Sequence, residues 1–257
     1  MENKKLTKLY DKIFKEGSSN FFTFNVFEES LLLLGMMSSW QDLEILEIGC
    51  GEGRLASMMS YAGAKSIDAI DYSQQAINLC KDNIKIKNIN YICGNYKELE
   101  KKYDVVVMQG VLEHLDEPFE ELKYIHDNML KEGGTIVTSS PSFLNPRGYV
   151  WMTLQTLFDI PMSLTDLHFL CPFDFEEFCE KNNCSLEIKS GYQDWGSGEG
   201  MIKDFNKRLR NALRDAEMDN TKVDKLLNWL AKSTSYFNRD QYSGAIVAYK
   251  IKGKVSK

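Results

Sequence analysis

Hydrophobic residues follow two different periods along the chain. In residues 1–42 and again after residue 195 they recur every three or four positions, which predicts amphipathic helices. Between these parts, short apolar runs alternate with helical stretches, a pattern typical of βαβ units and a parallel sheet. The predicted strands are Ile45–Ile48, Ile67–Ile70, Tyr91–Cys93, Val105–Met108, Thr135–Ser139, Leu186–Ser190 and Ala245–Ile251.

Capping residues and apolar spacing locate the predicted helices. Ser73 can cap a helix over Ser73–Lys87, and Asp174, with Glu177 three residues later, predicts a capping box that opens a short helix. Residues 141–172 are rich in aromatic side chains and are expected to be irregular. Two amphipathic helices are expected between the last two strands, lined by Met201, Phe205, Leu209 and Leu213 and by Val223, Leu226, Leu227 and Leu230.

Composition and charge narrow the class of protein. With 257 residues and 43% hydrophobic residues, the chain can bury a continuous core without disulfide bonds or metals. A net charge of -6 argues against nucleic acid as a partner, because proteins that bind it usually carry a basic stripe. The six cysteines form no C-x-x-C pair, and the longest apolar run, Leu31–Met37, is too short to span a bilayer. These features predict a cytoplasmic protein without a transmembrane segment.

The segment Leu46–Leu55, LEIGCGEGRL, carries the strongest chemical signal. It follows a predicted strand and opens a helix, where glycines allow a tight turn and close approach of a ligand. The spacing is G-x-G-x-G, and Glu47 precedes the first glycine by two positions, which suits a ligand with an ammonium group better than a pyrophosphate. Asp71, twenty residues after Gly51, ends the next strand, where its carboxylate can accept hydrogen bonds from both hydroxyls of a ribose.

Four segments together resemble the class I S-adenosylmethionine-dependent methyltransferases. They are LEIGCGEGRLA, AIDYS at Ala69–Ser73, YDVVVMQGVLEHLDEP at Tyr103–Pro118 and LKEGGTIVTSSPS at Leu130–Ser142, in the order of that family. The resemblance implies a Rossmann-like α/β fold with a seven-stranded, mostly parallel sheet whose last strand is antiparallel. It also implies an enzyme that uses S-adenosylmethionine and releases S-adenosylhomocysteine.

The resemblance assigns the cofactor-binding residues position by position. The three glycines would lie under the methionine part of the cofactor, Glu47 near its amino group and Asp71 at its ribose. Tyr72 would pack on the adenine, with simple core packing as the alternative, and Asn95 stands where the family often has Asp. The whole predicted set is Glu47, Gly49, Cys50, Gly51, Gly53, Asp71, Tyr72, Asn95, Tyr96, Gln109 and Gly110.

The parts of the chain are expected to form one methyltransferase domain over residues 1–257. They are an N-terminal helical cap (1–42), a cofactor-binding core (43–142), an acceptor-side segment (143–194), a helical insertion (195–240), and the last strand and tail (241–257). The basic residues of the insertion are Lys203, Lys207, Arg208, Arg210 and Arg214. They predict either a solvated face or a lid over an anionic acceptor. A further use of the insertion is homodimerisation through Phe205, Leu209, Leu226 and Leu230.

Methyl transfer to oxygen needs a base or a metal besides correct positioning, because a neutral hydroxyl is a poor nucleophile. Two of the three histidines are candidate bases, His114 after the fourth strand and His168 in the aromatic segment. A structural role through a backbone hydrogen bond is the alternative for His114. His126 is expected at the surface of the helix Glu117–Leu130.

The segments EHLDEP, TSSPSFLNPRGYVW and DLHFLCPFDFEEFC are similar to the ubiquinone-biosynthesis O-methyltransferases and their relatives. Those groups have E-x-x-E-H after the fourth strand, and several bind a divalent metal there. Here Gly110 replaces the first Glu and leaves Glu113 and His114, so we expect no required metal. The expected acceptor is a small molecule, aromatic or anionic, methylated on oxygen. The alternatives are a nitrogen acceptor and a homologue that binds the cofactor without catalysis.

Overall fold

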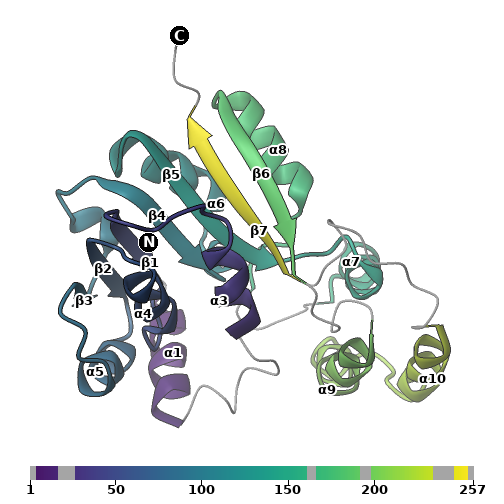
Figure 1. Ribbon diagram of the computed structural model, residues 1–257. Helices are drawn as coiled ribbons and strands as arrows, with labels where there is room; N and C mark the ends of the chain where they lie inside the picture. Colours follow the sequence, from purple (N-terminus) through teal and green to yellow (C-terminus); the bar gives the residue numbers. More distant parts are fainter. Residues whose placement is uncertain (1–3, 17–26, 161–165, 192–197, 234–245, 254–257) are drawn as a thin grey trace.

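A computed structural model describes residues 4–16, 27–160, 166–191, 198–233 and 246–253, with a seven-stranded sheet at its centre (Figure 1). The strands are β1 (Glu44–Ile48), β2 (Ser66–Asp71), β3 (Ile89–Cys93), β4 (Tyr103–Gln109), β5 (Leu130–Pro141), β6 (Cys184–Ser190) and β7 (Ile246–Gly253). They lie in the order β3-β2-β1-β4-β5-β7-β6. The pairs among β1 to β5 are parallel, whereas β7 is antiparallel to both β5 and β6. The predicted sheet is therefore confirmed; Ala245, its predicted last-strand start, lies outside the described residues.

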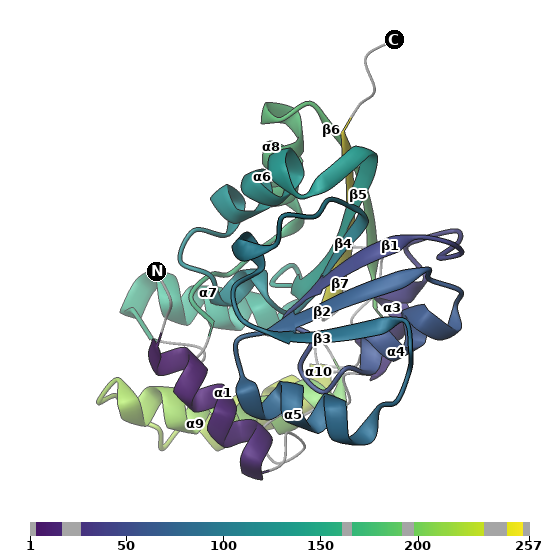
Figure 2. The same cartoon turned by 90° about the vertical axis from the view of Figure 1, so that its left-hand side faces the viewer.

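Helices cover both faces of the sheet, which explains the continuous apolar run Val105–Met108 in the central strand β4. The helices are α1 (Lys4–Glu16), α3 (Phe27–Leu34), α4 (Arg54–Tyr61), α5 (Gln74–Asn83), α6 (Pro118–Asn128), α7 (Pro146–Phe158), α8 (Pro172–Lys181), α9 (Glu199–Asp215) and α10 (Val223–Ser233). α3, α4 and α5 pack on the face that carries Ile45 and Val105. α6 and α8 pack on the opposite face, which carries Leu46 and Val106 (Figure 2).

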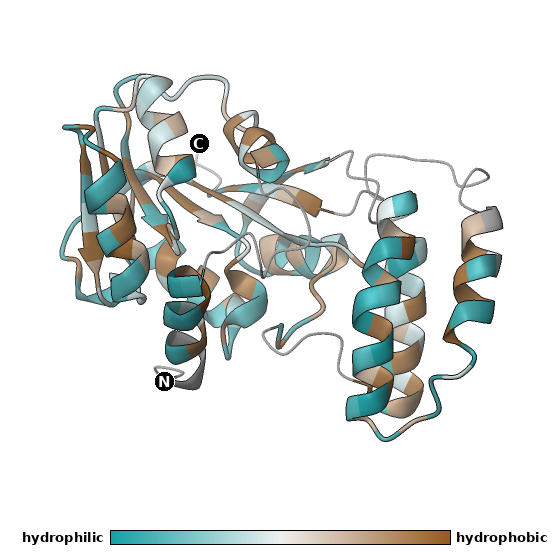
Figure 3. Ribbon diagram, turned by 90° about the horizontal axis from the view of Figure 1, so that it is seen from below, coloured by the Kyte–Doolittle hydropathy of each residue, from teal (hydrophilic) through white to brown (hydrophobic). Residues whose placement is uncertain are grey.

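A third hydrophobic cluster lies beside the sheet and joins α7, α9 and α10 (Figures 1 and 3). Trp151 of α7 contacts Phe205 of α9 at a ring-centroid distance of 5.6 Å. Phe205, Leu209 and Leu230 are at most 2% exposed, so they pack inside the molecule. These residues cannot form a surface for a second copy, and the predicted dimer contact through them is wrong.

The segment predicted to be irregular, residues 141–172, contains the helix α7. The side chain of Asn145 accepts a hydrogen bond from Gly148 N at 2.9 Å and caps the helix. Pro146 follows at the first helical position, where the missing N–H costs nothing. Asn followed by Pro is thus a helix start here, and the prediction of an irregular segment was wrong over α7.

Helix starts elsewhere follow the predicted chemistry, with one shift. Ser73 caps α5, since its Oγ accepts from Ala76 N at 3.2 Å, although α5 ends at Asn83. α8 begins earlier than predicted, because Asp174 lies within its first turn and accepts from Cys171 N at 2.7 Å. The predicted capping box is therefore displaced by three residues toward the N-terminus. No helix in the described part of the chain combines the length and hydropathy that a bilayer crossing requires.

Candidate functional site

The turn between β1 and α4 is shaped by three glycines with positive φ. Gly49, Gly51 and Gly53 have φ values of 73°, 50° and 74°. A Cβ at Gly49 would lie 2.6 Å from Cγ2 of Val111, so only glycine fits that position. Gly49 N donates to the carbonyl of Ile70 at 2.8 Å and fixes the turn against β2. The sequence motif thus folds into a rigid turn at the carboxyl ends of β1 and β2.

Asp71 at the end of β2 braces this glycine turn. Its Oδ2 accepts from Gly51 N at 2.9 Å, and its Oδ1 accepts from Ser73 N at 2.8 Å. Burial raises the pKa of Asp71, although these backbone hydrogen bonds oppose the shift. Ser73 also donates to Asp11 of α1 at 2.5 Å, so the N-terminal helix is held at the same place. Two predicted cofactor positions, Gly51 and Asp71, are therefore in direct contact.

Glu47 lies in β1 and is buried, with 2% of its surface exposed. Within the described part of the chain its Oε2 has no hydrogen-bond partner. Burial raises its pKa well above the usual range, with Cys80 and Asp71 adding to the effect. The neighbouring Cys50 is also buried, and Cys80 Sγ donates to the Gly51 carbonyl at 3.2 Å. A buried carboxyl with an unsatisfied oxygen suits a ligand that brings a cationic donor, as the ammonium group of S-adenosylmethionine would.

The residues after β2 and β3 differ in exposure and in the hydrogen bonds that their side chains make within the protein. Tyr72 is 40% exposed, which excludes the core-packing alternative for its ring. Asn95 caps the short helix Tyr96–Glu98 by accepting from Lys97 N at 3.0 Å. Tyr96 is buried, and its hydroxyl donates to Glu121 of α6. Of the two tyrosines, Tyr72 is therefore the one whose side chain a ligand can reach, while the cofactor roles of Tyr72, Asn95 and Tyr96 stay predictions.

Gln109 at the end of β4 binds α3. Ser30 Oγ donates to Gln109 Oε1 at 2.8 Å, and Gln109 Nε2 donates to Glu29 Oε2 at 3.3 Å. Glu29 Oε1 also accepts from Ser139 of β5 at 2.7 Å. Gly110 follows with φ +62°. α3 is thus anchored by polar side chains to the carboxyl ends of β4 and β5, directly beside Gly110.

His114 lies in the 3-10 turn Leu112–His114 after β4 and contacts two distant parts of the chain. Its Nε2 is 3.2 Å from the hydroxyl oxygen of Tyr10 in α1, and its Nδ1 is 3.5 Å from Oδ1 of Asp166. The carboxylate at Nδ1 favours the tautomer that carries its proton there, which leaves Nε2 to accept from the hydroxyl. Such an arrangement can take up a proton at Nε2 and stabilise the imidazolium with Asp166.

His168 lies on the neighbouring segment but faces another partner. Leu167 N and His168 N donate to the Glu113 carbonyl at 2.7 and 3.2 Å. The imidazole Nε2 is 3.0 Å from the carbonyl oxygen of Asp116, to which it donates. The structure therefore brings the segments of both candidate bases together, with the Nε2 of His168 bonded to the backbone.

Tyr10, Glu29 and Asp166 are site residues that were not predicted from the sequence. Tyr10 is one of the apolar positions that repeat along α1. Glu29 lies in the acidic first turn of α3, where its charge complements the helix dipole. Each therefore has a local explanation that hides its long-range contact. Tyr10 and His114 are 104 residues apart in sequence, so only the fold places them together.

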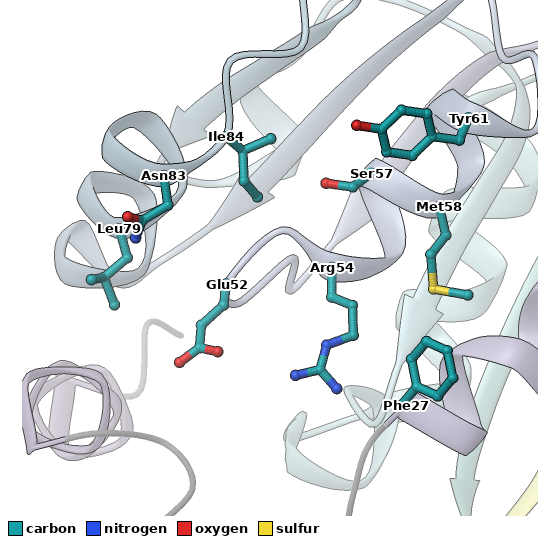
Figure 4. A pocket seen from close by; sticks show the side chains of 9 residues that line it. All are labelled: Phe27, Glu52, Arg54, Ser57, Met58, Tyr61, Leu79, Asn83 and Ile84. Carbon is teal, nitrogen blue, oxygen red and sulfur yellow. The ribbon is translucent and has the colours of Figure 1, made fainter.

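A cavity of about 540 Å³ lies beside the glycine turn, between α4 and α5 (Figure 4). Its lining residues are Phe27, Glu52, Arg54, Ser57, Met58, Tyr61, Leu79, Asn83 and Ile84. None of the predicted cofactor residues, all of which the structure describes, lines this cavity. The candidate site is therefore the edge formed by the strand ends. In the described ranges, no group of three or more His, Cys, Asp or Glu side chains is arranged to hold a metal ion.

Comparison with known proteins places the chain within one family. A family model described as a methyltransferase domain matches residues 4–186. The mitochondrial ubiquinone biosynthesis O-methyltransferase of Dictyostelium discoideum is 26% identical over 172 residues, 59% of this chain and 52% of that protein. The ribosomal protein L11 methyltransferase of Lactobacillus johnsonii is 32% identical over 119 residues, 44% of this chain and 36% of that protein. The chain thus matches about half the length, or less, of these curated relatives.

Solved structures share the fold at low sequence identity. A chain in the complex of the Haloferax volcanii Trm112 methyltransferase activator with a methyltransferase has a TM-score of 0.65 and 12% identity, covering 95% of this chain and 97% of that one. The [4+2]-cyclase SpnF has a TM-score of 0.62 and 13% identity, covering 98% of this chain and 96% of that one. At this identity the likeness shows the fold alone, and the acceptor has to be inferred from the site.

Proposed function

The chain belongs to the class I S-adenosylmethionine-dependent methyltransferases, and from this premise we propose that it methylates a hydroxyl group of a small molecule. Bound S-adenosylmethionine supplies a methyl group already activated by the sulfonium. In the proposed cofactor site, Glu47 meets the ammonium group, Asp71 the ribose and Tyr72 the adenine. The buried, unsatisfied oxygen of Glu47 and the exposed ring of Tyr72 support this arrangement.

The observation that carries the proposal is the contact between Nε2 of His114 and the hydroxyl group of Tyr10. The Tyr10 hydroxyl lies 3.2 Å from this nitrogen, while Asp166 lies at Nδ1. An acceptor hydroxyl in the same position would give its proton to Nε2 as its oxygen attacks the methyl carbon. The new C–O bond forms as the C–S bond breaks, and its electron pair stays on sulfur, giving S-adenosylhomocysteine. Asp166 would stabilise the imidazolium until the proton leaves to solvent.

The proposed division of the chain follows from which segment supplies each group. Residues 43–142 would bind the cofactor, and residues 143–194 would complete the acceptor site through Asp166. The ion pairs of the insertion support a solvated face over a lid for an anionic acceptor. Arg208 contacts Asp204 at 3.1 Å, Arg214 contacts Asp215 at 2.9 Å, and Arg210 contacts Asp224.

The test combines cofactor binding with identification of the methylated product. Calorimetry should show micromolar binding of S-adenosylmethionine and S-adenosylhomocysteine. A panel of small hydroxyl compounds, including phenols and sugars, is then screened by product mass, and the methylated atom is assigned by NMR. Methyl transfer to nitrogen would exclude the proposed chemistry, and cofactor binding without turnover on any acceptor would favour the non-catalytic alternative.

His114→Gln tests the proposed base. The amide keeps hydrogen-bonding atoms but cannot take up the proton, so we expect turnover to fall by about 10²–10⁴-fold with unchanged binding of S-adenosylhomocysteine. The matched control is His126→Gln on α6, which lies away from the site. There the imidazole Nδ1 is 2.8 Å from Oδ1 of Asp127. His168→Gln is expected to have a smaller effect, because its Nε2 bonds the backbone. Wild-type turnover in His114→Gln would remove His114 as the base.

A further inference from the structure

Two carboxyl groups outside the cofactor set face the space over Gly110. From the position that a Cβ would take at Gly110, Oε1 of Glu113 lies 3.5 Å away and Oε1 of Glu29 lies 4.0 Å away. Among the described residues these are the only heavy atoms within 4 Å of that point, apart from Gly110 and its chain neighbours. The two side chains come from the turn after β4 and from α3, so the fold converges them on one small space.

Glu113 is a buried residue with one carboxyl oxygen that the described part of the chain leaves unsatisfied. The residue is 3% exposed, and within the described ranges its Oε2 has no hydrogen-bond partner. A buried carboxyl oxygen without a donor is unfavourable by the cost of its lost hydration. Burial, followed by the nearby charge of Asp166, raises the pKa of Glu113 well above its usual range.

Glu29 has polar partners but no cationic one in the described part of the chain. Its oxygens accept from the neutral side chains of Ser139 and Gln109. Burial raises its pKa despite these hydrogen bonds. The ion pairs among the described residues include neither Glu29 nor Glu113. The Glu29–Glu113 pair is thus a doubly acidic recess beside the proposed methyl-transfer centre, with Glu113 buried and Glu29 half-buried.

We propose that the Glu29–Glu113 pair binds an ammonium group of the acceptor, so that the substrate is an amino alcohol. An ammonium group has three N–H donors and can reach a carboxylate oxygen from each side chain at once. Its charge is matched by acids that the fold otherwise leaves without a cation. This inference rests on the proposed function for the statement that oxygen is the methylated atom.

The recess also explains how such an acceptor would be methylated on oxygen. An amine held as ammonium by two carboxylates has no lone pair and cannot attack the methyl carbon. The hydroxyl of the same molecule would reach His114, which directly follows Glu113 in the chain. The two acids therefore protect the nitrogen and position the hydroxyl at the base.

The direct test uses methylammonium chloride as the probe and the backbone amide signal of Gly110 as the readout. With the protein loaded with S-adenosylhomocysteine, we expect methylammonium to shift this signal, and equal concentrations of sodium or tetramethylammonium chloride to leave it in place. The response should disappear in Glu29→Gln and Glu113→Gln and persist in Glu28→Gln, an exposed neighbour on α3. Binding of S-adenosylhomocysteine shows that each variant is folded.

Three outcomes would overturn the inference. Methylammonium and sodium could give the same spectrum, a comparison that needs no variant. The methylammonium response could survive both substitutions. Magnesium chloride could shift the Gly110 signal where methylammonium does not, which would make the recess a metal site.

A second experiment separates this inference from the proposed function. trans-2-Aminocyclohexanol and its neutral counterpart trans-1,2-cyclohexanediol are compared in two ways. Each is tested as a methyl acceptor and as an inhibitor of methyl transfer to any acceptor found in the screen. We expect at least a tenfold preference for the amino alcohol in the wild type and none in Glu113→Gln. Equal use of both compounds sinks the amine site and leaves O-methylation intact. A preferred amino alcohol that is methylated on nitrogen sinks O-methylation and leaves the amine site intact.

Discussion

Asp71 has two tasks at the residue scale, because the oxygens proposed to face the ribose already accept from Gly51 N and Ser73 N. Removing this carboxylate changes the ligand contact and the shape of the glycine turn together. A matched acid on the same strand is needed to tell cofactor binding from stability. Asp68 of β2 is such an acid. Its carboxylate accepts a hydrogen bond from Asn90 and lies 3.0 Å from Lys101 Nζ, and both contacts are away from the glycine turn.

Asp71→Ala is expected to weaken S-adenosylmethionine binding at least tenfold, because both the ribose contact and the brace of the turn are lost. It should also lower the free energy of unfolding by about 1–3 kcal/mol, since the backbone N–H groups lose their acceptor. Asp68→Ala should lower stability while leaving the dissociation constant unchanged. Calorimetry and urea unfolding measure the two effects. Equal dissociation constants for the two variants would contradict the assignment of Asp71.

Gly49 and Gly133 form a natural pair for testing what the glycine turn requires. Both have positive φ, 73° and 74°, but a Cβ at Gly133 meets no heavy atom of the described residues within 4 Å. Gly133→Ala should therefore lower the free energy of unfolding by only about 1–2 kcal/mol, the cost of placing a residue with a Cβ in a left-handed backbone conformation. Gly49→Ala adds the clash with Val111 and should cost about 1–3 kcal/mol more.

The double variant Gly49→Ala/Val111→Ala checks the cause. Removing Cγ2 of Val111 should recover most of the extra loss, as measured by urea unfolding. An unrecovered loss would show that the clash lies elsewhere.

Residue chemistry was predictable from sequence where it is local. The glycines, Glu47 and Asp71 lie within one strand-turn-helix unit and the next strand, so spacing alone predicts their proximity. Tyr10, Glu29 and Asp166 reach the site from three distant segments. Their side chains have no shared local pattern, and their convergence depends on how α1, α3 and the aromatic segment pack on the sheet.

The buried ion pair between α7 and α9 governs how these elements hold together. Arg147 Nε lies 2.7 Å from Asp204 Oδ2, and the side chains are only 4% and 1% exposed. Arg208 contacts the other oxygen of Asp204 at 3.1 Å. Removing Asp204 therefore leaves the buried Arg147 guanidinium without its carboxylate, whereas removing Arg147 leaves Asp204 paired with Arg208.

Asp204→Asn should therefore lower the free energy of unfolding by about 3–5 kcal/mol. Arg147→Met should lower it less, because Arg208 still contacts Asp204. The double variant Arg147→Met/Asp204→Leu should lose much less, because no buried charge is left unmatched. Arg210→Ala, which breaks an exposed pair with Asp224, should stay within about 1 kcal/mol of the wild type. Urea unfolding measures all four. A loss in Asp204→Asn no larger than in Arg210→Ala would show that the ion pair does not join the helices.

Element prediction succeeded where apolar periodicity was strong and failed where a cap decided the structure. All seven strands and the helices α9 and α10 were expected, since their hydrophobic positions repeat clearly. α7 was missed because Asn145 and Pro146 are as common in turns as at helix starts. Gly148 within its first turn weakened the helical pattern further, so tertiary packing of Trp151 completes what local propensity leaves open.

At the scale of the whole molecule, buried acids set how stability depends on pH. Burial raises the pKa of Glu47 and of Glu113 well above the usual range of a glutamate side chain. In the folded protein these groups keep their protons at pH values where the unfolded chain has lost them. Their effect is therefore most favourable below the unfolded pKa, and stability falls as pH rises through the folded pKa.

The stabilising effect of the protonated acid should accordingly shrink as pH rises above about 4.3, the pKa of glutamate in an unfolded chain. Glu113→Gln removes the titration of one such acid, so the wild type should lose more stability than Glu113→Gln between about pH 5 and about pH 8. Glu28→Gln should follow the wild type. Urea unfolding at both pH values provides the measurement. An equal change of stability in the wild type and in Glu113→Gln over this interval would contradict the raised pKa of Glu113.

β7 joins the edge strand β6 to the rest of the sheet, because it pairs with β5 on one side and β6 on the other. During translation, β5 and β6 are synthesised before residues 246–253. During synthesis both strands wait with unpaired hydrogen-bonding edges, and such edges pair readily with other chains. The nascent protein is therefore most exposed to aggregation while α9 and α10 are being translated. Slower elongation there would prolong that exposure, and emergence of β7 from the exit tunnel ends it.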